Sequence, residues 1–299
     1  MAKSNLRKGA LASALGAALL APGGANALVI DQTSAGDAAT LAALLAGAGS
    51  GITVVGGTES FIGDALASGT FSGAGGAIGI DEGVIFSSGD AADAVGPNAL
   101  DATTTDFGNP GDADLDTASP DPTFDAAGIV FEFTTTTGDL FFSYVFASEE
   151  YNEFVGGTVN DAFGFFVDGV NIALVPGTSD PVNIDTVNCD NPFAPPGGSN
   201  CSLFNNNDLD DGGPFFDVEY DGFTDVFTAS ILGLGAGSHT MKLVVGDGGD
   251  RILDSAVFLE AGSFSGTDPT DPTIPEPATV ALMGLGLAGL GWSRRKARA

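Results

Sequence analysis

The sequence is poor in basic residues. Of its 299 residues only 9 are Lys or Arg, against 39 Asp or Glu, and the formal net charge is −30. Seven of the nine bases lie within the first eight or the last six residues, which leaves Lys242 and Arg251 between them. Residues 28–275 therefore carry a formal charge of 2 − 38 = −36. A body this acidic should repel nucleic acid and anionic polymers, and it should favour divalent cations wherever its carboxylates converge.

The first 27 residues have the features of a secretory signal peptide. Three basic residues precede the apolar run ALASALGAALLAP, and the motif Ala25-Asn26-Ala27 supplies the small residues of a cleavage site. We expect cleavage after Ala27. An ordinary Ala-rich buried helix is the alternative, and the charged start and the small-residue end argue against it.

The other end of the chain contains a linker and a short apolar segment. A Pro/Asp/Thr linker (266–274) precedes the triplet Pro275-Glu276-Pro277, an apolar segment (278–292) and a basic tail (294–298). Residues 275–299 resemble the PEP-CTERM sorting signal of exported bacterial proteins, in which Pro-Glu-Pro is recognised by an exosortase-type membrane enzyme. The segment is shorter than the ~20 apolar residues of a full membrane crossing, which suits a transient anchor.

The C-terminal segment has a second interpretation, a permanent transmembrane helix held in the cytoplasmic leaflet by its Arg/Lys cluster. Both interpretations, the processed signal and the permanent helix, place the acidic body outside the cytoplasm. We expect the export machinery to carry the chain across the inner membrane. It should then reach the cell surface or the extracellular space, anchored transiently by its C-terminal segment.

Cysteine and histidine are also scarce. Cys189 and Cys201 are the only two cysteines, and they flank a loop rich in Pro and Gly. In an oxidising compartment they most simply form one disulfide, worth about 3 kcal/mol in the loop-closure model. A zinc site with His239 is the weaker alternative, because two Cys and one His supply too few nitrogen and sulfur ligands.

Between the two signals, residues 28–265 predict one mainly β domain. Asp37 is placed to cap a short helix whose leucines follow helical spacing. After it come short segments rich in β-branched and aromatic residues and separated by Gly, Asn, Asp and Pro, which favour an antiparallel, jelly-roll-like β-sandwich. Residues 96–125 have few apolar side chains and should form a surface insertion. The expected strands are 129–133, 140–146, 162–167, 171–175, 215–220, 226–231, 239–245 and 256–260. The signal segment and the C-terminal apolar segment add a helix at each end.

Several stretches of this domain resemble one known family. GTFSGAGGAIGIDEGVIFSSGD, FASEEYNEFVGGTVNDAFGFFVDG and VVGDGGDRILDSAVFLEAG are similar to the choice-of-anchor L domain of bacterial surface proteins. The resemblance covers most of residues 36–264. It implies a surface or secreted protein, and it implies no particular activity.

Acidic residues gather next to the expected strands. Glu149, Glu150 and Glu153 follow one strand, Asp161 precedes another, and three more acids lie in the Gly-rich loop GDGGDRILDS. Loops at one end of a sandwich come together, and hard oxygen ligands from such loops bind Ca²⁺ in extracellular modules. The sequence therefore predicts a structural calcium site, with a solvated acidic edge as the alternative. The predicted ligands are Glu149, Glu150, Asp161, Asp247, Asp250 and Asp254.

Two further acidic loops are less specific. Asp112, Asp114 and Asp116 have the odd-position spacing of a calcium loop but lack the Gly and Glu of an EF-hand. Residues 205–213 have similar chemistry. Asx-turns and solvation explain both loops at least as well.

These observations favour a noncatalytic surface or extracellular-matrix protein, adhesive or structural, with calcium-stabilised loops. Its partners would be the sorting enzyme and an extracellular polysaccharide or other surface proteins, and not nucleic acid. One alternative is a lectin-like module that holds a sugar through the same calcium. A second is a glycoside hydrolase that uses two of Glu149, Glu150, Glu153 and Asp161 as its carboxylate pair.

Overall fold

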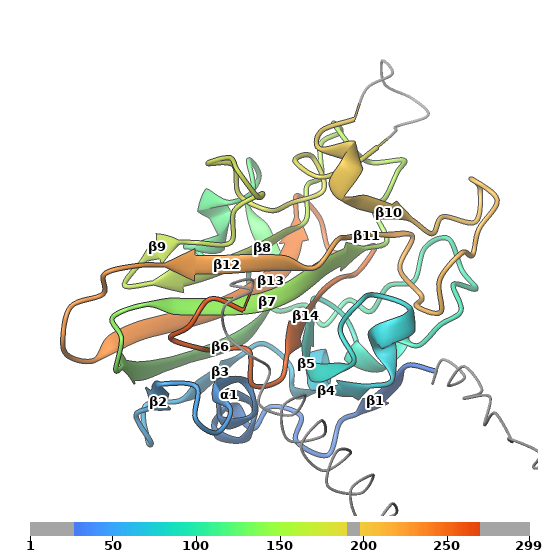
Figure 1. The fold of residues 1–299 in the computed structure, drawn as a ribbon. Helices are drawn as coiled ribbons and strands as arrows, with labels where there is room; N and C mark the ends of the chain where they lie inside the picture. Colours follow the sequence, from blue (N-terminus) through green and yellow to red (C-terminus); the bar gives the residue numbers. More distant parts are fainter. Residues whose placement is uncertain (1–26, 190–197, 270–299) are drawn as a thin grey trace, which may run out of the picture.

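The computed structural model describes residues 27–189 and 198–269 (Figure 1). The cleavage site at Ala25 and Ala27 falls at the edge of this range, and Ala25 lies outside it. The sorting triplet Pro275 to Pro277 and the helices expected at both ends also lie outside the described residues. Within residues 27–189 and 198–269, no helix has both the length and the apolar character needed to span a membrane.

The larger sheet is antiparallel and contains eight strands in the order β1-β4-β5-β14-β7-β11-β10, with β12 also paired to β7. Its long central strand, β7, pairs with β14 through residues 144–148 and with β12 through residues 140–144. The strands are β1 Val29–Asp31, β4 Ser68–Ser72, β5 Glu82–Ser87, β7 Leu140–Ser148, β10 Phe204–Asn206, β11 Gly222–Thr224, β12 Phe227–Ile231 and β14 Ser255–Glu260.

The smaller sheet is also antiparallel and contains six strands in the order β2-β6-β13-β8-β9, with β3 paired to β6. Its long strands β6 and β13 pair along most of their length, with one irregularity between Val245 and Asp247. The strands are β2 Ile52–Val54, β3 Ser60–Ile62, β6 Thr123–Thr135, β8 Ala162–Val167, β9 Val170–Asn171 and β13 His239–Gly248.

The main core lies between the two sheets, as the alternation of apolar residues along β7 predicts. Phe142, Tyr144 and Phe146 point from the larger sheet into the same core as Phe163 and Phe165 of the smaller one. Phe142 meets Phe165 edge-to-face at 4.1 Å between ring centroids, a geometry that aromatic pairs prefer. The predicted antiparallel β-sandwich is therefore confirmed.

One α-helix, α1 (Ala38–Ala46), covers an edge of the sandwich near β2 and β3 (Figure 1). The Asp37 side chain accepts a hydrogen bond from the Thr40 backbone N–H, so the predicted cap is confirmed. Leu41 and Leu45 are buried in the main core, while Leu44 faces outward. The 3₁₀ turns are η1 Ala65–Ala67, η2 Ala74–Gly76, η3 Ala91–Ala94, η4 Leu115–Thr117 and η5 Cys201–Leu203.

Two of the expected strands do not form as predicted. Of residues 171–175 only Asn171 belongs to a strand, the short β9 that pairs with β8. The Asn171 side chain accepts from the backbone N–H groups of Phe165 and Ala173 in place of a longer ladder. Residues 215–220 wrap around Asn207, whose Oδ1 accepts from the N–H groups of Phe215 and Phe216. Local side-chain acceptors therefore override strand propensity at both places.

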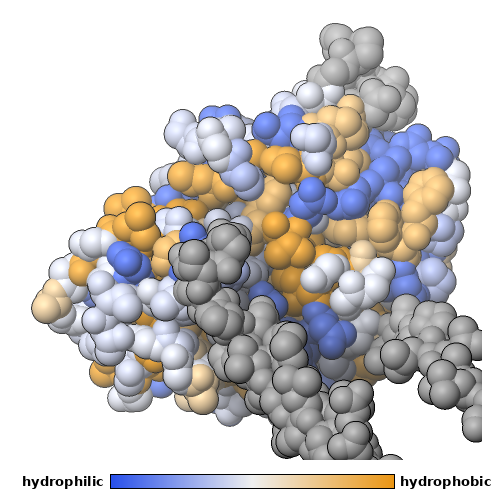
Figure 2. All heavy atoms as spheres, in the orientation of Figure 1, coloured by the Kyte–Doolittle hydropathy of each residue, from blue (hydrophilic) through white to orange (hydrophobic). Residues whose placement is uncertain are grey.

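The expected surface insertion, residues 96–125, is in part a packed connection. Its last three residues already belong to β6, and Leu115 and Ala118 are buried against the outer face of the smaller sheet. On the visible face of the molecule, hydrophilic residues gather over β10 and the loop that follows it (Figure 2).

Candidate metal centre

The two chain connections that carry the predicted metal ligands meet at one end of the sandwich. The connection from β7 to β8 and the connection from β13 to β14 each cross from one sheet to the other. They are joined by backbone hydrogen bonds, one from Glu149 N to Asp254 O (3.0 Å) and one from Asn160 N to Gly248 O (2.8 Å). The expected convergence of these loops is therefore present.

Five of the six predicted ligands lie inside the protein. Each is 2 % exposed or less, whereas Asp250 is half-buried. Burial of a carboxylate is costly unless a cation or several hydrogen-bond donors compensate it. We call these five residues the buried acid cluster: Glu149, Glu150, Asp161, Asp247 and Asp254.

Asp161 lies at the centre of this cluster and has a donor for each carboxylate oxygen. Its Oδ1 accepts from Gly248 N at 2.8 Å, and its Oδ2 accepts from the Ser255 hydroxyl at 2.7 Å. Its own backbone N–H donates to Oε2 of Glu150 at 3.1 Å. Asp161 therefore ties the start of β8 to both neighbouring connections.

The rest of the cluster is under-compensated. Oε1 of Glu149, Oε1 of Glu150 and Oδ1 of Asp247 are buried and have no hydrogen-bond partner in the described part of the chain. All three atoms are acceptors. Buried acceptors without donors are uncommon in folded proteins, so these oxygens need a proton, a water molecule or a cation.

The electrostatic consequence is a set of carboxyl groups that hold their protons in the metal-free protein. Burial raises the pKa of Glu149 and of Glu150 to about 11, and neighbouring carboxylates add to the effect. Burial raises the pKa of Asp161 to about 8 and of Asp254 to about 7, and it raises the pKa of Asp247 well above its usual range. Desolvation and like charge act in the same direction here.

The few basic side chains lie elsewhere. Lys242 Nζ contacts Asp112 Oδ1 at 2.6 Å and Asp114 Oδ2 at 2.7 Å, and it thereby offsets part of the negative charge of one of the two weaker acidic loops. Arg251 binds the buried Asp125 at 3.3 Å. Among the described residues, neither base forms an ion pair with the buried acid cluster.

A segment remote in sequence supplies part of the missing compensation. We call residues 98–105 the strap. The Thr103 backbone N–H donates to Glu149 Oε2 (3.4 Å), and the Thr105 N–H donates to both carboxylate oxygens of Asp254 (3.1 and 3.0 Å). The strap is also held by Glu219, whose carboxylate accepts from the N–H groups of residues 99 and 100. It therefore closes over one side of the cluster.

A second group of acids was not predicted as a site. In residues 27–189 and 198–269, one set of three acidic residues brings a ligand atom of each within 4.8 Å of the others: Asp101, Asp208 and Asp221. None of the six predicted ligands belongs to it. Asp208 comes from the second weak acidic loop, and the other two come from unrelated parts of the sequence, so no spacing pattern could have brought the three together.

The cysteines are joined as predicted. Cys189 and Cys201, 12 positions apart in the sequence, form a disulfide. The zinc alternative is wrong, because both sulfur atoms are used in this bond. His239 instead hydrogen-bonds Asp168 at 2.8 Å.

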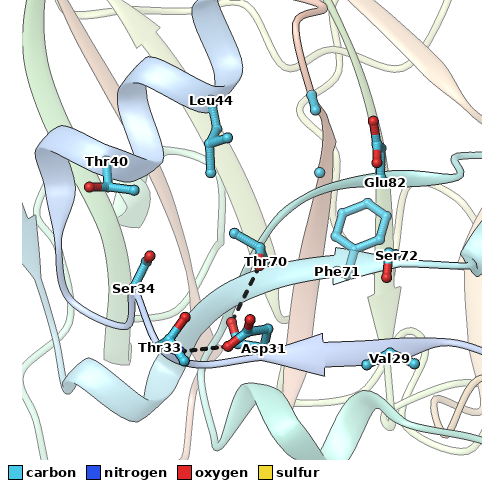
Figure 3. Close-up of a pocket in the computed structure, with 12 residues that line it drawn as sticks. Val29, Asp31, Thr33, Ser34, Thr40, Leu44, Thr70, Phe71, Ser72 and Glu82 are labelled. Atoms are coloured by element: carbon cyan, nitrogen blue, oxygen red, sulfur yellow. Dashed lines mark hydrogen bonds between the residues drawn. The ribbon is translucent and has the colours of Figure 1, made fainter.

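A pocket of about 570 Å³ opens between β1, α1 and β4 (Figure 3). Thr33, Thr70 and Glu82 give it polar walls, and hydrogen bonds from Thr33 N and from the Thr70 hydroxyl hold the strand at Asp31. No residue of the buried acid cluster lines it, and neither do Asp101, Asp208 and Asp221. The pocket is therefore separate from the candidate metal centre.

Comparison with known proteins identifies the domain and the sorting motif. The sequence matches the choice-of-anchor L domain over residues 37–265 and the PEP-CTERM protein-sorting motif over residues 273–296. No curated protein and no solved structure matches the chain. The sorting motif indicates an exported protein of the cell surface or the extracellular space. The chain therefore belongs to the choice-of-anchor L domain family and carries a PEP-CTERM sorting motif.

Proposed function

We propose that this protein is a noncatalytic component of the cell surface or extracellular matrix, adhesive or structural, and that calcium bound by its buried acid cluster stabilises the exported fold. The sorting motif supports the location, through processing by an exosortase-type enzyme. The chemistry rests on one observation, the burial of five carboxyl groups without a basic partner among the described residues.

A bound divalent cation is the ordinary solution for acids in this position. The orphaned oxygens of Glu149, Glu150 and Asp247 are hard ligands, the kind that Ca²⁺ takes in groups of six to eight at 2.3–2.6 Å. The nitrogen and sulfur ligands that would favour a transition metal are engaged elsewhere, His239 with Asp168 and the two cysteines in their disulfide. Extracellular modules bind calcium with dissociation constants of about 10⁻⁴ to 10⁻³ M, so such a site fills outside the cell.

The same burial argues against the glycoside-hydrolase alternative. A carboxylate pair that cleaves a polysaccharide must contact the glycosidic oxygen and the anomeric carbon. Glu149, Glu150 and Asp161 are each 1 % exposed or less, so a sugar chain has no access to them in this fold. Glu153 alone of the four candidates is partly exposed, and a single carboxylate does not make a pair.

The lectin alternative meets a related difficulty. A sugar held through calcium needs an ion with coordination positions open to solvent, whereas the five side chains of the buried acid cluster are each 2 % exposed or less. The open pocket beside α1 is lined by none of the cluster residues. We therefore assign the calcium a structural role.

Thermal unfolding of the protein recovered from the cell exterior tests this proposal. Calcium binds the folded state alone and should stabilise it by RT ln(1 + [Ca²⁺]/Kd), about 2.7 kcal/mol at a hundredfold excess over Kd. Chelation should therefore lower the melting temperature of the wild type. The substitution Glu150→Gln keeps the shape of the side chain and should remove the part of that difference that the buried acid cluster contributes.

The matched control is Glu82→Gln, which removes the same charge from an exposed position away from the cluster. It should leave the calcium response unchanged. A wild-type protein that melts at the same temperature in calcium and in chelator, at fixed ionic strength, contradicts the calcium proposal. Turnover of a glycan by the purified protein would contradict the noncatalytic assignment.

A further inference from the structure

Three segments far apart in the sequence meet at a second acidic group. Asp101 belongs to the strap, Asp208 follows β10, and Asp221 directly precedes β11. A ligand atom of each lies within 4.8 Å of the other two. Asp208 and Asp221 are buried and Asp101 is exposed, so the group lies just below the surface. We call these three residues the loop acid triad.

The surrounding chain holds the triad in place without the help of an ion. Asn207 fixes the loop that carries Asp208, because its Nδ2 donates to the carbonyls of Val218 and Tyr220 while its Oδ1 accepts from Phe215 and Phe216. Its own backbone N–H donates to the carbonyl of residue 221 at 2.7 Å. The hydrogen bonds of Asn207 therefore hold together the two segments that carry Asp208 and Asp221.

The strap is fixed independently on the other side. The Glu219 carboxylate accepts from the N–H groups of Ala99 (3.0 Å) and Leu100 (3.2 Å) and from the Thr103 hydroxyl (2.8 Å). These bonds flank Asp101 on both sides in the sequence. These hydrogen bonds hold the Asp101 carboxylate near those of Asp208 and Asp221 despite the repulsion between like charges.

An independent observation points to a ligand at this place. Oδ2 of Asp221 is buried, with the whole residue 1 % exposed, and it has no hydrogen-bond partner in the described residues. Asn98, 3 % exposed, also has an unsatisfied buried oxygen, because its Oδ1 receives no hydrogen bond in the described residues. Its Nδ2 donates to Asp221 Oδ1 and to the carbonyl of Asn207. Both partners of Nδ2 are acceptors, which fixes the orientation of the amide.

The negative charge around the loop acid triad also favours a bound cation. Burial raises the pKa of the Glu153 carboxyl to about 7, and the nearby charges of Asp208 and Asp101 add to this effect. Burial and the same acids raise the pKa of Asp221 to about 8. The ion pairs of Lys242 and Arg251 lie elsewhere. The group therefore offers several oxygens and no positive charge among the described residues.

We propose that Asp101, Asp208 and Asp221 bind a divalent cation, with Asn98 Oδ1 as a neutral oxygen ligand, and that this ion clamps the strap to the β10–β11 connection. Calcium fits best, because every donor is oxygen and Ca²⁺ accepts six to eight oxygen ligands in flexible geometry. Magnesium demands near-ideal octahedral geometry and is usually bound through one or two carboxylates with several waters retained, so it suits three carboxylates from separate segments less well. This site is distinct from the buried acid cluster and does not depend on it.

Calorimetric titration of chelator-treated protein with Ca²⁺ tests the proposal, using the exported protein as it is recovered from cells. Asp208→Asn and the exposed Asp101→Asn should each remove one binding site or weaken it at least about tenfold. Because Asp101 is at the surface, its substitution leaves the fold intact. The control Asp217→Asn removes the same charge from an exposed position between Asp208 and Asp221 and should bind calcium like the wild type.

The titration also separates this proposal from the one made for the buried acid cluster. If the cluster does not bind calcium, the wild type and Glu150→Gln should both bind a single ion, and Asp101→Asn should bind none. If both sites exist, Asp101→Asn and Glu150→Gln should each lose one ion. Equal binding by the wild type, Asp101→Asn and Asp208→Asn overturns the loop acid triad as a site, as does a wild type that binds no calcium.

Limited proteolysis supplies a second readout that follows the strap itself. Leu100, 63 % exposed, lies next to Asp101. Leu232, 66 % exposed, follows β12 at the Leu140 end of β7, whereas Asp221 precedes β11 at the Ser148 end. Calcium should slow cleavage after Leu100 by a chymotrypsin-like protease, and it should do so in the wild type but not in Asp101→Asn. Cleavage after Leu232 is the internal control. Equal protection at both bonds, or none at Leu100, contradicts a local clamp.

Discussion

The backbone N–H of Asp161 donates a hydrogen bond to Oε2 of Glu150 at 3.1 Å, while Oε1 of the same carboxyl has no partner among the described residues. Oε2 of Glu150 is thus hydrogen-bonded within the connection between β7 and β8, whereas Oε1 needs a proton or a cation. In metal-free protein the proton takes that place, because burial raises the pKa of Glu150 to about 11.

This relationship predicts an unusual dependence of stability on pH. Between its unfolded pKa near 4.5 and its folded pKa of about 11, Glu150 holds a proton in the folded state that the unfolded state has lost. The free energy of unfolding of the metal-free protein should therefore fall as the pH rises through this window. Denaturant titrations in chelator at about pH 5 and about pH 8 check this, and greater stability at the higher pH would contradict it.

Gly89 packs directly against the buried acid cluster. A Cβ at this position would lie 1.7 Å from Oδ2 of Asp254, the carboxylate that receives the N–H of Thr105. Gly89→Ala should push Asp254 away from the strap and lower the free energy of unfolding by about 1–3 kcal/mol, as overpacking does. Gly56→Ala, where the added Cβ meets nothing within 4 Å, is the control and should change stability by less than about 1 kcal/mol. Equal effects of the two substitutions would contradict this role of Gly89.

The disulfide should contribute measurably to stability. Cys189 and Cys201 close a short loop, and the chain-entropy model assigns such a cross-link about 3 kcal/mol. Replacing both cysteines by serine should lower the free energy of unfolding by about that amount, measured at one fixed calcium concentration. A double variant as stable as the wild type would show that the bond does not constrain the unfolded chain.

The two ends of the chain should be removed during export. If residues 1–27 are a signal peptide and the segment after Pro275-Glu276-Pro277 is processed by a sorting enzyme, the mature protein lacks both. Intact-mass measurement of the protein recovered from the cell exterior decides this. A chain that still ends at Ala299 would instead indicate a permanent anchor.

The sequence pattern predicted those features that depend on residues close together in the chain. The cap at Asp37 and the disulfide follow from single residues and short spacings, and the sandwich follows from the alternating apolar residues of β7. The meeting of the β7–β8 and β13–β14 connections followed from one general property of sandwiches, that loops at the same end lie together.

The remaining features depend on contacts between distant segments. The short strands β1 to β5 were not expected, since segments such as β4 (Ser68–Ser72) are short and contain Gly, Ser and Thr without a clear period. Residues 215–220 have strand propensity, but the Asn207 side chain captures their N–H groups. Asp101, Asp208 and Asp221 come together only because Glu219 and Asp254 bind the strap, which no local signal indicates.

The most direct test of calcium at the buried acid cluster is the number of protons released when the ion binds. At pH 7 the Glu150 carboxyl is protonated in the metal-free protein. A cation that binds this carboxyl must therefore displace the proton. Calcium titrations of the wild type in two buffers of different ionisation enthalpy should show release of about one proton or more per ion, and Glu150→Gln should release fewer. Calcium binding without proton release, or equal release by the wild type and Glu150→Gln, would contradict the account.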